Sequence, residues 1–159
     1  PAEYGAWSLM LGAAWILVAG AGASLRAFEA ADATGLRSAF LAWMPILGAA
    51  GLGQLFVGAL TYLMPVVIGG GPSAVRVGVG VLEAGAPIRE AARNVAAVLA
   101  LAVASLGGTS AERLTIAAWV VLLATYLVDI VLMARCGVAQ ARAKRAVASS
   151  PTTQGGRRG

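Results

Sequence analysis

The sequence contains no histidine and only one cysteine, Cys136. Without histidine, the chain lacks the usual protein ligand for haem, for type 1 copper and for catalytic zinc. A single cysteine excludes both an internal disulfide and a Cys-x-x-Cys site. We therefore expect this chain to hold no metal ion and no cofactor of its own.

Charged residues are also scarce. They make up 12% of the 159 residues, whereas 59% are hydrophobic and the mean hydropathy is +0.81; a soluble domain is about 25% charged. The net charge of +5 does not indicate a nucleic-acid partner, because half of the basic residues lie from Arg135 onward, beside an apolar run where basic residues signal membrane topology. The composition predicts an all-α, polytopic membrane protein whose first partner is the lipid bilayer.

Four apolar runs have about the length that crosses the roughly 30 Å hydrocarbon core of a bilayer. The third run is the least regular, because Arg89, Glu90 and Arg93 lie in its first turns and must snorkel to the interface or be enclosed by other helices. We predict a four-helix transmembrane domain followed by a disordered basic tail, with the spans at about residues 7–25, 38–68, 87–106 and 114–135, the domain over 1–146 and the tail over 147–159.

Lysine and arginine are unevenly distributed between the two sides of these spans. Most of them lie in the loop 69–93 and after the fourth span, and few lie in the loops on the other side. The positive-inside rule then places both termini in the cytoplasm.

The longest uncharged stretch lies between Arg37 and Arg76. On a helix it carries a stripe of small and polar residues, which is typical of a span that packs against other spans, namely Gly51, Gln54, Gly58, Thr61 and Pro65. We predict that Gln54, Thr61 and Tyr62 face inward. Interhelical hydrogen bonding is the favoured role for these three side chains, and a substrate or quinone pocket is the alternative.

This stretch closes on Gly69, Gly70, Gly71 and Pro72. We interpret the four residues as a helix stop, because glycine adopts positive φ freely and proline cannot continue the hydrogen-bond ladder. A phosphate-binding loop is disfavoured, since the lysine and the serine or threonine of a P-loop do not follow. The next segment, 73–84, alternates valine with small residues, and we predict a short interfacial helix there rather than an isolated strand.

Asp129 is the polar residue of the fourth run that most needs an explanation. It lies six residues before Arg135, so about 9 Å inside the boundary of that run. A carboxylate at that depth is costly unless it is paired or solvated. No basic residue lies within one turn of its own helix, whereas Arg93 and Arg89 begin the third run on the same side. A structural ion pair is favoured, and a proton or ion relay is the alternative.

One part of the sequence resembles a known family. The residues are Gln54, then Val57-Gly-Ala-Leu-Thr-Tyr-Leu-Met-Pro-Val-Val67, then Gly69-Gly-Gly-Pro72. They resemble a membrane domain of actinobacterial membrane-anchored multicopper oxidases and copper-containing nitrite reductases. The resemblance implies a bacterial plasma-membrane protein, of which this chain is the later half of a multi-span domain. A further span and a copper-binding cupredoxin domain would follow in the longer protein.

Two functional hypotheses follow, with a third that is weaker. The first is a membrane anchor and assembly domain of a copper-oxidase-like redox protein, without a catalytic centre of its own; its partners would be other transmembrane helices of that protein or a second copy of the chain. The second is a small transporter or proton-conducting protein that uses Asp129 and the seam around Gln54. The third is an enzyme with an intramembrane quinone or lipid site.

Overall fold

The computed structural model describes residues 3–104 and 108–149. Every regular element in these residues is helical, as the sequence predicted. The elements are α1 (Glu3–Phe28), α2 (Ala33–Pro45), the π-helical η1 (Ile46–Leu52), α3 (Gly53–Ile68), α4 (Gly71–Leu82), α5 (Ala86–Ala104) and α6 (Thr109–Ser149).

Three helices are long and apolar enough to cross a membrane. They are α1, the continuous helix that α2, η1 and α3 form together, and α6. The predicted third span corresponds to α5, whose 19 residues include three charged side chains in the first two turns. These charges, rather than its length, distinguish α5 from the three helices that are apolar enough to cross a membrane.

The boundaries of the second long helix are set by identifiable residues. Asp32 caps its start, since the carboxylate accepts a hydrogen bond of 2.7 Å from the backbone N–H of Gly35. At its other end Gly69, Gly70 and Gly71 have φ values of 69°, 103° and 87°, a region that L side chains rarely adopt. Pro72 then lies in the first turn of α4, so the predicted helix stop and the following helix are both present.

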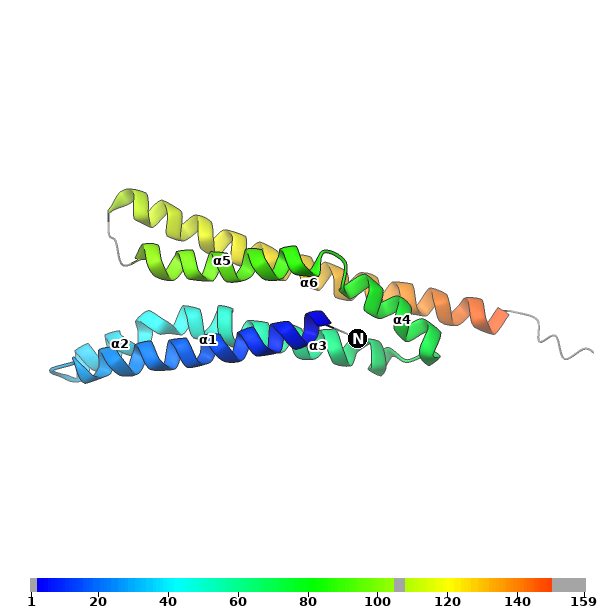
Figure 1. The fold of residues 1–159 in the computed structure, drawn as a ribbon, viewed down its shortest axis with the longest axis horizontal. Helices are drawn as coiled ribbons and strands as arrows, with labels where there is room; N and C mark the ends of the chain where they lie inside the picture. The colour runs from blue at the N-terminus through cyan, green and yellow to red at the C-terminus, as the bar shows by residue number, and fades with distance from the viewer. Residues whose placement is uncertain (1–2, 105–107, 150–159) are drawn as a thin grey trace, which may run out of the picture.

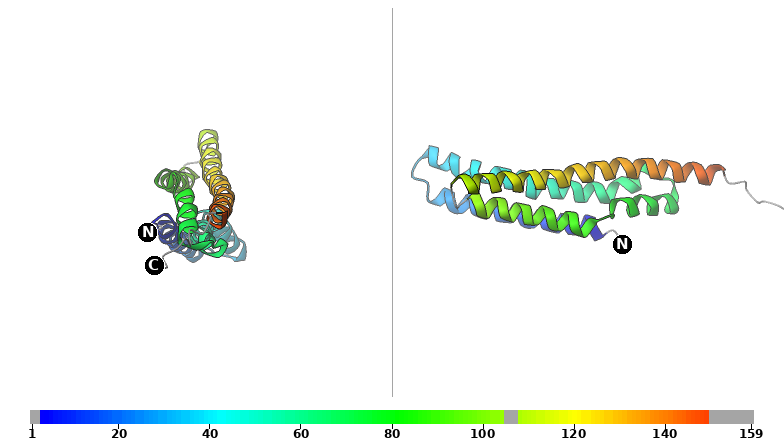
Figure 2. Two further views of the ribbon diagram at one scale, coloured as in Figure 1. Left: turned by 90° about the vertical axis from the view of Figure 1, so that its right-hand side faces the viewer. Right: turned by 90° about the horizontal axis from the view of Figure 1, so that it is seen from above.

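The helices form two groups along a common long axis. In Figure 1, α1 runs beside the continuous helix of α2, η1 and α3, whereas α5 pairs with the first half of α6 and α4 pairs with its second half. The views in Figure 2 show the same pairings. The start of α1 and the end of α6 point toward the same end of the molecule.

Glycine lets α1 and the continuous helix approach closely. A methyl group on Gly12 would lie 2.9 Å from the carbonyl oxygen of Gly51, and one on Gly58 would lie 2.9 Å from the carbonyl oxygen of Gly5. Both glycine pairs therefore place backbone against backbone, as small residues do between membrane helices. The predicted stripe from Gly51 to Pro65 is buried at all five positions.

Tyr62 does not face inward, contrary to the prediction. Its side chain is 61% exposed, whereas its neighbour Thr61 is buried. The reason is geometric, because consecutive residues of an α-helix point about 100° apart and only one of the two can lie on the packed stripe.

The last helix is longer than the sequence indicated. It was expected to end near Arg135, but α6 continues to Ser149 and includes the first residues of the predicted tail; residues 150–159 lie outside the described part. Packing explains the extension. Gln140 is buried between two helices and donates to the carbonyl oxygens of Pro65, at 3.0 Å, and Ala74, at 3.3 Å.

Candidate functional site: a buried ionic cluster

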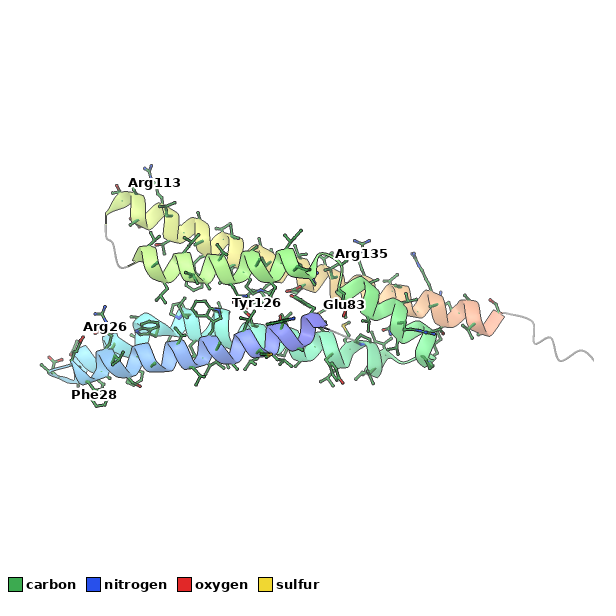
Figure 3. All side chains as sticks on the ribbon, viewed as in Figure 1. Arg26, Phe28, Glu83, Arg113, Tyr126 and Arg135 are labelled. Carbon is green, nitrogen blue, oxygen red and sulfur yellow. The ribbon has the colours of Figure 1, made fainter. Side chains whose placement is uncertain are left out.

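Polar side chains from α1, α5 and α6 meet where α1 begins. Figure 3 marks this region by Tyr126 and Glu83, midway along the long axis, between the two groups of helices. We call the five residues at its centre the ionic cluster: Tyr4, Arg89, Glu90, Arg93 and Asp129. All five side chains are buried.

Asp129 lies at the centre of the ionic cluster and is 3% exposed. Its Oδ2 accepts from Nη2 of Arg93, and its Oδ1 lies 3.3 Å from Nε of Arg89. The hydroxyl of Tyr4 donates to both carboxylate oxygens, at 3.0 and 3.1 Å. Both arginines considered from the sequence therefore contact Asp129, and α1 adds a donor that the sequence did not reveal.

Aromatic rings hold the two guanidinium groups in place. The Arg89 guanidinium carbon lies 4.6 Å from the centroid of Tyr4, and that of Arg93 lies 4.3 Å from the centroid of Tyr126. Arginine stacks well on such faces because its guanidinium is planar and weakly hydrated. Arg93 also donates from Nε to Thr125 Oγ1 at 3.1 Å.

The continuous helix contacts this side of the molecule through its π-helical segment η1. The hydroxyl of Tyr126 donates to the carbonyl oxygen of Ala49 in η1. At the end of η1, the N–H of Gly53 bonds to the carbonyl of Gly48 five residues earlier, which is the wider π register. A methyl group on Gly53 would lie 2.7 Å from the Tyr126 hydroxyl, so glycine leaves room for this contact.

Glu90 forms the second acidic part of the cluster. Its Oε2 accepts from Ser8 Oγ at 2.8 Å and lies 3.9 Å from Nη1 of Arg93. Asn94, one turn later, donates to the Glu90 carbonyl oxygen at 2.8 Å. The Oδ1 of Asn94 accepts from Gln54 at 3.1 Å, which joins the predicted seam to the cluster.

The formal charges of the cluster balance. Two arginines face two carboxylates, so the helices bury four charged groups without burying a net charge. A buried charge is tolerated when it is paired and hydrogen-bonded in this way. Among the described residues, the buried polar atoms without a hydrogen-bond partner are Nε and Nη1 of Arg89, Nη1 of Arg93, Oε1 of Gln54, Oγ1 of Thr61 and Oγ1 of Thr115.

Cavities flank the cluster on two sides. The first, of about 680 Å³, lies between α1 and the α4–α5 region and is lined by Tyr4, Trp7, Leu11, Glu83, Ala86, Pro87, Glu90, Ala91 and Asn94. The second, of about 290 Å³, lies between the η1–α3 region and α6 and is mostly apolar; Tyr126 and Asp129 are among its lining residues.

The predicted site residues are brought together only in part. Asp129 and Arg93 are in direct contact, and Gln54 joins them through Asn94. Thr61 is buried on the seam, where its hydroxyl makes no hydrogen bond within the described residues, and Tyr62 lies on the outer face. Sequence reasoning missed Tyr4, Ser8 and Glu90 as partners. Their only signal was a polar side chain close to the start of a predicted apolar run.

Within residues 3–104 and 108–149, no group of three or more acidic or cysteine side chains is placed to hold a metal ion. No protein-family model, no curated protein and no solved structure matches the chain. The resemblance to copper oxidases therefore stays a prediction.

Proposed function

We propose that this chain is a membrane anchor and assembly domain without a catalytic centre, held together by the ionic cluster. The observation that carries the proposal is the coordination of Asp129. Both of its oxygens are bound by side chains of two other helices, Tyr4 on α1 and the arginines of α5. A relay acid must exchange its proton with a neighbour, whereas arginine does not give up its proton in proteins. The arrangement favours a structural ion pair.

The same cluster supports a four-span arrangement with α5 as the third span. The 19 residues of α5 are about 28 Å long, close to the thickness of the hydrocarbon core. Its charged residues oppose membrane burial when α5 is considered alone. Within the cluster they pair with each other and with Asp129, so the cost of placing α5 in the membrane falls.

The distribution of basic residues supports cytoplasmic termini. Arg26 and Arg113 lie toward one end of the molecule, and Arg135 lies toward the other (Figure 3). The extended part of α6 beyond Arg135 carries Arg142, Lys144 and Arg145. This end is therefore the more basic one, and the positive-inside rule assigns it to the cytoplasm.

Site-directed labelling tests the topology. Single cysteines at the exposed positions Ala31, Thr109 and Ser149, each in a Cys136→Ser background, are treated with a membrane-impermeant maleimide on intact cells. We expect labelling of the first two from outside, and of the third only after permeabilisation. Labelling of Ala31→Cys and Ser149→Cys from the same side would contradict the four-span arrangement.

Proton flux tests the anchor function against conduction. Purified protein and its Asp129→Asn variant are placed in liposomes that contain a pH-sensitive dye, and a potential is applied with valinomycin and potassium. We expect the flux of both to equal that of protein-free liposomes, and the variant to unfold at a lower temperature. Flux that requires Asp129 would reject the anchor proposal and support the second candidate.

That second candidate, a small transporter or proton conductor, is favoured by the cavities. Tyr4 lines the cavity of about 680 Å³ and Asp129 lines the one of about 290 Å³, and the two residues are hydrogen-bonded to each other. A continuous polar connection between two cavities is what a conducting path needs. Only the flux experiment separates this candidate from the first.

The redox partner of the anchor is proposed from the resemblance alone. An anchor of this kind would serve a longer protein that carries a copper-binding cupredoxin domain. Sequencing the gene beyond residue 159 tests this. A further apolar run followed by a segment with the histidines and cysteine of a cupredoxin site is the expected result, and a gene without them would leave the anchor without this partner.

A further inference from the structure

We propose that the cavity between α1 and α5 is a binding site for a membrane-soluble organic cation, meaning an ammonium or phosphonium centre on an apolar body. The cavity volume of about 680 Å³ lies in the range of small-molecule sites, roughly 300–1,000 Å³. Neither the anchor function nor the copper resemblance requires such a site.

The charged side chains that line the cavity are all acidic. Glu83 and Glu90 both contribute to its wall, and no lysine or arginine does. The arginines of the cluster are not among the lining residues: Arg93 bonds to Asp129 and Thr125, and Arg89 lies against the ring of Tyr4 and bonds to the carbonyl oxygen of Leu82 at 2.6 Å. The charged groups that a ligand in the cavity would touch directly are therefore carboxylates.

The Glu90 carboxylate is held in place and still has unused acceptor positions. It is 8% exposed, and Ser8 fixes its Oε2 at 2.8 Å. The nearest guanidinium nitrogen, Nη1 of Arg93, lies 3.9 Å away, which is too far for a hydrogen bond. An ionised carboxylate offers about four lone-pair positions. Glu90 thus remains able to contact a cation that enters from the cavity.

Aromatic and apolar walls complete the site. Tyr4 and Trp7 line the cavity together with Leu11 and the small face of α5. Aromatic faces attract cations most strongly where water is excluded, and apolar walls suit a hydrophobic body. The Trp7 side chain is 56% exposed, so a ligand has access from the outside of the helix pair.

Anions and neutral carbonyl compounds such as quinones fit less well. Such ligands need hydrogen-bond donors, but the Tyr4 hydroxyl already donates to Asp129. The amide of Asn94 already donates to the carbonyl oxygen of Glu90 and, at 3.4 Å, to its Oε1. Among the side chains that line the cavity, this leaves the indole N–H of Trp7 as a donor.

A pair of isosteric ions provides the test. Radiolabelled tetraphenylphosphonium and tetraphenylborate have the same shape and opposite charge. Binding of each is measured on the purified 159-residue chain in lipid nanodiscs, with empty nanodiscs as background. We expect saturable binding of the phosphonium and none of the borate above background. Equal binding of both ions, or of neither, would overturn the proposal.

Three variants locate the site. Glu90→Gln keeps the size of the side chain and removes its charge, and we expect it to weaken phosphonium binding by about tenfold, as loss of one ionic contact does. Ala91→Phe fills the cavity without changing charge and should abolish binding. Val95→Phe, on an exposed position of α5 outside the lining, is the matched control and should bind as the parent does.

Melting temperature and gel-filtration profile are recorded for each variant. If Glu90→Gln unfolds, the comparison of Ala91→Phe with Val95→Phe decides alone. Identical binding by these two variants rejects the site, because only one of them occupies the cavity. The outcome is independent of the flux experiment, since a domain without proton conduction can still bind a cation.

Discussion

Tyr4 in the first turn of α1 donates its hydroxyl to both carboxylate oxygens of Asp129 on α6, at 3.0 and 3.1 Å, across 125 positions of sequence. The contact joins the first helix to the last. It also places a phenol between the two groups of helices; without α1, the group that contains α5 and α6 would leave Asp129 with the arginines of α5 only. Removing the Tyr4 hydroxyl alone should therefore lower the stability of the bundle.

Tyr4→Phe removes that hydroxyl and leaves the ring beneath Arg89 in place. We expect a loss of about 1–3 kcal/mol in the free energy of unfolding, because a hydrogen bond to a buried charge is lost. The measurement is chemical unfolding in mixed micelles. Tyr62→Phe is the control, since Tyr62 is 61% exposed, and it should change nothing. Equal effects of the two substitutions would contradict the geometry.

Breaking the pair between Arg93 and Asp129 should cost more. Arg93→Met leaves a buried carboxylate with one guanidinium fewer, and we expect a loss of about 3–5 kcal/mol. The double variant Arg93→Met, Asp129→Leu removes both charges and should recover part of the loss, because no unpaired charge of this pair remains.

A double-mutant cycle over the two positions measures this coupling. Arg113→Met, on an exposed arginine of α6, supplies the control for lost charge alone. If the losses of the two single variants simply add in the double variant, the ion pair makes no contribution to stability.

The glycine contacts between α1 and the continuous helix allow a matched comparison on a single helix. Gly12→Ala places a methyl group 2.9 Å from the carbonyl oxygen of Gly51 and should destabilise the domain by about 1–3 kcal/mol. Gly20→Ala has no atom within 4 Å of the new methyl group and should be neutral or stabilising, since alanine favours the helix. Thermal unfolding of both variants checks the difference, and an equal effect would show that close approach is not needed.

The docking of α4 on the extension of α6 makes a further prediction. A methyl group on Gly78 would lie 2.7 Å from Cδ of Gln140, whereas one on Gly80 meets nothing within 4 Å. Gly78→Ala should therefore release α4 and raise amide hydrogen exchange over residues 71–82 by about tenfold or more. Gly80→Ala should leave exchange at the parent level. Unchanged exchange in both variants would argue that α4 is held elsewhere.

Much of the fold follows from local pattern. The helix stop at Gly69–Pro72 and the buried stripe through Gln54 were predicted correctly, because both depend on backbone conformation and helical periodicity within a few turns. The sequence also indicated Arg89 and Arg93 as the basic partners of Asp129, because both lie at the start of the third apolar run, on the same side as Asp129. Tyr4 was not found, because nothing local distinguishes a tyrosine that meets a distant carboxylate from one that anchors at an interface.

Composition and periodicity by themselves determined that this protein is helical, apolar and able to enter a membrane, because hydropathy and backbone hydrogen bonding act on contiguous residues. The tertiary structure alone decided that Tyr62 lies outside, that α6 continues to Ser149 against α4, and that Asp129 binds groups from two other helices. These features depend on which distant surfaces pack together. Which groups pair with a buried charge is determined by which helices pack together.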